Sequence, residues 1–141
     1  MNDDTFRDLA SLFFTTRQII RAKIPSGKAD PNAWLRCETL RFIAQADGPT
    51  MQDVAAYLRV KAPSATSLIA NLDRERAVVR RGEARDKRIT RIYLTPHGRK
   101  LLAAYTKRSA ATMRSVFSKL NAAEIHELGR VLRRLRDMHG A

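Results

Sequence analysis

Residues 50–95 read TMQDVAAYLRVKAPSATSLIANLDRERAVVRRGEARDKRITRIYLT, and this stretch decides the fold. Its first four residues resemble a capping box, with Asp53 in place of the usual Glu, and predict a short helix that buries Val54, Ala55 and Leu58. Pro63 suits the first position of a second helix, which we expect to run to about Arg76 with Ala65, Leu68, Ile69 and Leu72 facing inward. Two short helices joined by a turn of about four residues match the helix-turn-helix pattern.

The pattern changes period after the second helix. Val78-Val79 opens a short strand, residues 82–87 are polar, and residues 89–94 alternate with β-branched and aromatic side chains. We therefore expect a β-hairpin at Val78–Leu94, with a basic tip that carries Arg85, Lys87 and Arg88. Thr95-Pro96 then marks the start of another helix, because a capping residue followed by proline is typical of a helix N-terminus.

Helical periodicity also covers both ends of the chain. Residues 5–24 predict a helix capped by Thr5, residues 25–30 a connector, and a further helix is expected from about Pro31, capped by Asp30, to a point before Gly48. Residues 96–119 predict a long helix, and a second capping-box-like start at Asn121 precedes a last helix that spaces Ile125, Leu128, Leu132 and Leu135 like a coiled coil. The terminal helices are apolar on one face, and a second copy of the chain is the simplest partner for that face.

Composition restricts the class of protein. The 141 residues fit one compact domain, or a small domain with helical extensions, and carry a net charge of +13. Residues 59–100 hold 12 Lys and Arg against four acids, so the attraction for polyanions is concentrated around the hairpin. The single cysteine, Cys37, fits a reducing cytoplasm, and neither a secretory signal nor a membrane span is evident. We expect a soluble, cytoplasmic protein.

The second short helix and the hairpin are candidates for contact with duplex DNA. Ser64, Ser67 and Asn71 form the outward arc of that helix, with Thr66 at its border, and an Asn can pair with adenine in the major groove. An arginine on a thin hairpin can enter the minor groove, and Asp86 is placed to orient the Arg88 guanidinium as a fork. The alternatives are a solvated helix face and a solubilising turn; the two features together favour DNA contact.

Three motifs together resemble the MarR (multiple antibiotic resistance regulator) family. They are residues 63–72 (PSATSLIANL), a D-x-R wing motif at Asp86-Lys87-Arg88, and an L-T-x-x-G motif at Leu94–Gly98. The order of the predicted helices and strands resembles that family over nearly the whole chain, and the motifs themselves resemble it over Thr50–Arg99. One departure is Ala77, because relatives usually place a Gly where the recognition helix ends.

The resemblance implies the fold and the domain organisation. We expect a mainly α protein with a small β-hairpin wing, forming a single MarR-like domain over residues 1–141. Its winged helix-turn-helix lobe would span residues 31–95, with the wing at 78–94, and dimerisation helices at 1–30 and 96–141 would flank the lobe. The chain would form an interleaved homodimer on a pseudo-palindromic site, with recognition helices in successive major grooves and Arg88 in a flanking minor groove.

These expectations define a function and its site residues. The leading hypothesis is a sequence-specific transcriptional regulator, a repressor, released by a small aromatic anionic effector. The residues expected to contact DNA are Lys61, Ser64, Thr66, Ser67, Asn71, Arg74, Arg85, Asp86, Lys87 and Arg88. By resemblance, Phe13, Arg17, Trp34 and Tyr105 would line the effector pocket; the alternative is that the apolar ones belong to the core.

Other function classes receive less support from the sequence. No catalytic signature is present, so we expect neither an enzyme nor a cofactor. The histidines His97, His126 and His139 have no ligand spacing with Cys37, so no metal site is expected. Cys37 is either a small buried residue or a redox-sensing thiol activated by nearby Arg36 and Arg41. A nonspecific nucleoid or RNA-binding protein and a membrane-surface or protein-docking module remain as alternatives.

Overall fold

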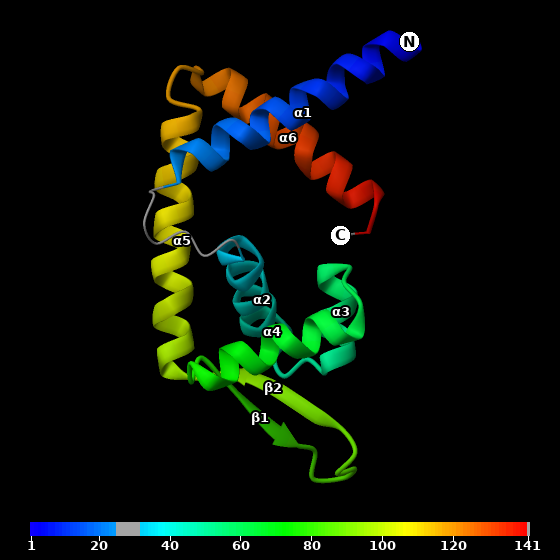
Figure 1. The fold of residues 1–141 in the computed structure, drawn as a ribbon, viewed down its shortest axis with the longest axis vertical. Helices are drawn as coiled ribbons and strands as arrows, with labels where there is room; N and C mark the ends of the chain where they lie inside the picture. Colours follow the sequence, from blue (N-terminus) through cyan, green and yellow to red (C-terminus); the bar gives the residue numbers. More distant parts are fainter. Residues whose placement is uncertain (25–31, 141) are drawn as a thin grey trace. The chain divides into compact units, whose positions relative to one another are not determined.

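The computed structural model describes residues 1–24 and 32–140. Within these ranges the chain is mainly helical with one β-hairpin, which confirms the predicted fold class (Figure 1). The elements are α1 (Asp3–Lys23), α2 (Ala33–Ala46), α3 (Met51–Leu58), α4 (Ala62–Arg74), β1 (Val78–Gly82), β2 (Thr90–Leu94), α5 (Pro96–Val116) and α6 (Ala122–Met138). The chain divides into two compact units: a central unit, Asp30–Lys107, and a terminal unit, which combines Met1–Ala29 with Arg108–Ala141.

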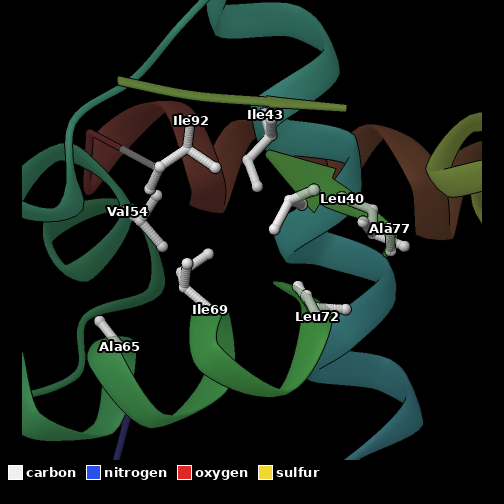
Figure 2. Packing of buried hydrophobic residues seen from close by; sticks show 9 residues of the cluster. Leu40, Ile43, Val54, Ala65, Ile69, Leu72, Ala77 and Ile92 are labelled. Atoms are coloured by element: carbon white, nitrogen blue, oxygen red, sulfur yellow. The ribbon is translucent and has the colours of Figure 1, made fainter. Parts of the chain in front are cut away.

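The central unit is built around one apolar core. Figure 2 shows side chains from α2, α3, α4 and the hairpin pointing toward one another. The fully buried members are Leu40, Ile43, Val54, Ala65, Ile69, Leu72, Ala77, Val78 and Ile92. Burial of Ala65, Leu68, Ile69 and Leu72 confirms the predicted inner face of α4. In α3 Val54 is fully buried, while Ala55 and Leu58 pack partly against the core.

The hairpin has the predicted limits and an additional neighbour. β1 and β2 pair antiparallel, in a register that runs from Val78 opposite Leu94 to Gly82 opposite Thr90. The Ile92 N–H donates to the Pro49 carbonyl at 2.9 Å, and Thr50 forms an isolated bridge with Arg91. The loop between α2 and α3 therefore lies alongside β2 and joins the hairpin to the helix-turn-helix.

Both predicted capping boxes form. The Thr50 hydroxyl accepts from the Asp53 N–H while the Asp53 carboxylate accepts from the Thr50 N–H, and Asn121 and Glu124 make the equivalent pair. These reciprocal bonds satisfy backbone donors that a helix N-terminus leaves free. They fix where α3 and α6 begin.

Several predicted helix ends are wrong by one or two residues. α1 begins at Asp3 because Asn2, not Thr5, is its N-cap: the Asn2 side chain accepts from the Thr5 N–H at 3.1 Å. α4 begins at Ala62, which places Pro63 at its second position, and ends at Arg74 rather than near Arg76. The predicted connector at residues 25–30 and the predicted start of α2 at Pro31 lie outside the described residues; α2 begins at Ala33, after Asn32.

α4 ends without a glycine. Arg76 takes the left-handed conformation, with a φ of 59°, and its N–H donates to the Asp73 carbonyl. The Ala77 N–H donates to the Leu72 carbonyl at 2.9 Å, which completes a Schellman-type helix end. The left-handed residue at this helix end is therefore Arg76 and not Ala77, where the glycine was expected. Ala77 itself is a buried core residue.

The L-T-x-x-G motif ties the start of α5 to this helix end. The Thr95 N–H donates to the Ala77 carbonyl at 3.1 Å, and the Thr95 hydroxyl accepts from the Gly98 N–H at 3.0 Å and donates to the Arg76 carbonyl. A Cβ at Gly98 would lie only 2.0 Å from the Ala77 carbonyl oxygen. The motif thus needs a hydroxyl at Thr95 and no side chain at Gly98.

The terminal unit leaves large apolar side chains exposed. Neither α1 nor α6 contains a buried residue. The exposed apolar residues of the two helices include Phe6, Leu9, Leu12, Phe13, Phe14, Ile19, Ile125, Val131, Leu132, Leu135 and Met138. None of the helices in the described ranges combines the length and the apolarity that a bilayer crossing requires.

Candidate nucleic-acid interface

The outward surface of α4 is polar and exposed. Ser64, Ser67, Asn71 and Arg74 are all exposed, at a spacing that places them along one side of the helix. Lys61, the N-cap residue, is also exposed, and the Thr66 hydroxyl donates to the Ala62 carbonyl at 2.9 Å. The opposite side of α4 is fixed in the core, so this polar surface has a defined orientation on the central unit.

Within this surface, Arg74 and Asn71 are paired. The Arg74 guanidinium donates to the Asn71 side-chain oxygen. Pairing of an Asn with adenine uses both the amide oxygen and the amide nitrogen. The Arg74 contact occupies one of the two lone pairs of that oxygen, so the pair presents mainly donors. The sequence identified both residues but not the contact between them.

The wing carries the fork that was predicted at Asp86. One Asp86 oxygen accepts from the Arg88 backbone N–H at 3.0 Å and from Nε at 3.1 Å, and the other accepts from Nη2 at 3.2 Å. The side-chain hydrogen bond from Arg88, followed by the backbone one, holds the pKa of Asp86 below its usual value. The Arg88 side chain is still 91% exposed, so the guanidinium is oriented without being covered. Arg85 and Lys87 are also exposed.

Further arginines on the two strands of the wing have specific partners. Arg80 on β1 lies 3.7 Å from the Asp73 carboxylate on α4, and Arg81 lies over the Tyr93 ring at 5.7 Å. Arg91 on β2 donates to the Gly48 carbonyl and to the Glu83 carboxylate. In the sequence these arginines were identified only as positive charge. Their positions in predicted strands could not reveal their partners, since Gly48 is 43 residues from Arg91.

An ion pair also joins α2 to the end of α4. The Arg36 guanidinium donates to the Glu75 carboxylate, and this hydrogen bond holds the pKa of Glu75 below its usual range. The same contact raises the pKa of Arg36 above its already high value. The arginine that the sequence placed near Cys37 therefore serves the packing of α4.

Residues 34–89, which are 56 of the 141 residues, match the family model described as MarR family. This central segment of the chain matches the MarR family. A search of the curated proteins gives no match.

Solved structures share the MarR fold over nearly the whole chain. A MarR family protein from Bacillus stearothermophilus is similar with a TM-score of 0.74 at 19% identity, covering 100% of this chain and 99% of that one. FabT of Streptococcus pneumoniae, solved in complex with DNA, gives 0.70 at 18% identity, with 99% and 98% covered. BpsR of Bordetella bronchiseptica gives 0.68 at 20% identity, with 94% and 98% covered. These likenesses show that the chain has the winged-helix fold of the MarR family proteins.

The four residues predicted to line an effector pocket fall into two units. Phe13 and Arg17 belong to the terminal unit, and Trp34 and Tyr105 to the central unit. Phe13 is 57% exposed and Trp34 62% exposed, so the alternative that they are core residues is wrong for a single chain. Tyr105 packs partly against the central core. The pocket itself stays a prediction.

Cys37 is buried, as expected of a small apolar residue. Its side chain belongs to the buried set at 5% exposure, and burial raises the pKa of the thiol although the nearby Arg41 charge lowers it. Arg41 Nη2 lies 3.7 Å from the sulfur, while Nη1 is bound to Glu38. A buried thiol with a raised pKa is a poor oxidant sensor, because the thiolate is the reactive form. The described residues contain no group of His, Cys, Asp and Glu that could hold a metal ion.

Proposed function

We propose that this chain is a MarR family repressor that binds a pseudo-palindromic operator as a homodimer. Its α4 would enter the major groove and Arg88 the minor groove, with contacts from Lys61, Ser64, Thr66, Ser67, Asn71, Arg74, Arg85, Asp86, Lys87 and Arg88. The observation that carries this proposal is the Asp86–Arg88 fork, an exposed and oriented guanidinium on the same compact unit as the exposed polar side of α4.

The geometry of the central unit supports simultaneous contact with both grooves. Small hydroxyl side chains such as Ser64 and Ser67 let a helix approach base edges, where sequence is read. The base of the wing shares its core with α4 through Val78 and Ile92, and Arg80 on β1 also contacts Asp73 on α4. An arginine held at the tip of a thin hairpin is suited to the negative potential of a narrow minor groove.

We propose that a second copy of the chain covers the exposed apolar side chains of α1 and α6. A single soluble chain rarely exposes this many large apolar side chains along two helices, and an obligate interface is the usual reason. This proposal assigns the terminal helices, residues 1–30 and 96–141, to dimerisation and residues 31–95 to DNA binding. A mass in solution equal to one 16.0 kDa chain at micromolar concentration would contradict it.

We also propose that a small aromatic anion releases the repressor. BpsR is described as regulated in its DNA binding by 6-hydroxynicotinic acid, which is such a molecule. Phe13 and Trp34 offer exposed rings, and Arg17 a cation, for a ligand of that class. The ligand would act by binding better to a conformation that misfits the operator. Aromatic carboxylates titrated into the operator complex test this, and binding that is unaffected by all of them would reject it.

The central experiment selects duplexes from a random pool with the full-length protein. We expect enrichment of an inverted repeat, and Arg88→Ala should weaken binding to it and lower the salt slope by about one. Arg7→Ala is the matched control, since it removes an exposed cation, also paired with a nearby aspartate, from α1, outside the central unit. Equal affinity for the selected and random duplexes at physiological salt would instead indicate a nonspecific nucleoid or RNA-binding protein.

A further inference from the structure

We propose that Arg91 is a positioning residue that fixes the wing to the loop between α2 and α3 and so sets where Arg88 meets DNA. The consequence for DNA rests on the function proposed above, whereas the coupling itself is a property of the fold. Arg91 belongs to none of the surfaces predicted to contact DNA. Its role follows from the two groups that its guanidinium holds together.

The Arg91 side chain joins two segments that are far apart in the sequence. Nη1 donates to the Gly48 carbonyl at 2.9 Å, and Nη2 donates to the Glu83 carboxylate at 3.3 Å. Glu83 follows β1 at the base of the wing tip, and its backbone N–H donates to the Ile89 carbonyl at 2.9 Å. One guanidinium thus holds the base of the tip and the loop that leads into α3.

The receiving carbonyl is itself held in place. Gly48 has a φ of 84°, and a Cβ there would lie 2.6 Å from the Tyr93 hydroxyl oxygen. Only glycine adopts this backbone conformation without strain and leaves room for the ring. Because the Ile92 N–H also donates to Pro49, the loop is bonded to β2 at successive positions. Substitution of Arg91 would therefore disturb both the wing and the start of α3.

The geometry distinguishes positioning from direct contact with a phosphate. The Arg91 side chain is 38% exposed and both of its terminal nitrogens are already bonded, in contrast to the 91% exposed Arg88. A planar guanidinium can hold two acceptors in fixed directions, which an ammonium cannot do. We therefore expect the effect of Arg91 on DNA binding to pass through Arg88.

A double-mutant cycle with Arg88 tests this. In the full-length protein, Arg91→Met keeps the apolar stem and removes the guanidinium, and Arg81→Met is the control because Arg81 pairs with Arg91 across the hairpin. We expect Arg91→Met to weaken binding to the selected duplex roughly tenfold, a loss typical of one good DNA contact, and Arg81→Met to weaken it much less. In the Arg88→Ala background, Arg91→Met should cost almost nothing further.

Two outcomes of the cycle would overturn the proposal. Additive losses would show that Arg91 binds the DNA backbone itself, and unchanged affinity for Arg91→Met would show that it only stabilises the fold. A measurement without DNA separates this proposal from the proposed function. Backbone amides of Glu83 and Ile89 should exchange hydrogen faster in Arg91→Met than in Arg81→Met, while the amide of Ile69 in the core keeps its protection.

The exchange result is decisive even if the wild-type protein does not discriminate between duplexes. In that case the proposed repressor function fails, while faster exchange at the wing still supports the coupling through Arg91. Unchanged exchange at Glu83 and Ile89 would reject the coupling whatever the protein binds.

Discussion

Substitution of Gly98 by alanine tests how closely α5 begins against the end of α4. The added Cβ would lie 2.0 Å from the Ala77 carbonyl oxygen, whereas ordinary contacts begin at 3.4 Å, so the two segments would have to separate by about 1.4 Å. Overpacking of this kind costs about 1–3 kcal/mol, and weakening of the Thr95 to Ala77 hydrogen bond costs about 1 kcal/mol more. The higher helix propensity of alanine offsets about 1 kcal/mol of this loss in the free energy of unfolding. We expect a net loss of about 2 kcal/mol.

Urea unfolding at a fixed protein concentration measures this loss, because the stability of a dimer depends on concentration. For a chain of this size the same loss lowers Tm by roughly 4–8 °C. Gly82→Ala is the control: a Cβ at Gly82 meets nothing within 4 Å, so its effect should stay within about 0.5 kcal/mol. Equal stabilities of Gly98→Ala and the wild type would refute the argument that close approach requires glycine at this position.

Three further predictions concern the wing and α4. Asp86→Asn raises the net charge by one, so Coulomb attraction alone predicts tighter duplex binding. We expect weaker binding in a fluorescence anisotropy titration, because the substitution removes the fork that orients Arg88. Tighter binding would refute the orienting role of Asp86. Arg76→Gly should raise the free energy of unfolding by about 1 kcal/mol, since a left-handed residue with a side chain is strained there; an unchanged urea midpoint would argue against that strain. Arg74→Ala frees the Asn71 side-chain oxygen, so duplex selection should shift one position from guanine, which offers two acceptors, toward adenine. An identical selected sequence would show that the pair does not read that base.

Local signals account for most of the elements that the sequence predicted. The alternation over residues 89–94 and the periodic burial of Ala65, Leu68, Ile69 and Leu72 each depend on neighbours a few residues away. The same is true of the capping boxes and of the fork between Asp86 and Arg88, whose partners lie two or three residues apart. Helix ends were the weaker predictions, because Asn2 and Thr5 are both acceptable caps and only the three-dimensional structure selects between them.

Contacts between distant segments could be decided only by the tertiary structure. Nothing in the sequence pairs Arg91 with Gly48, 43 residues away, or shows that the Gly98 backbone must approach Ala77. The sequence by itself determined the winged helix-turn-helix and the residues it presents, since periodicity and capping are local properties. The tertiary structure decided how the wing is held, because that depends on which remote backbone groups are brought within hydrogen-bond distance.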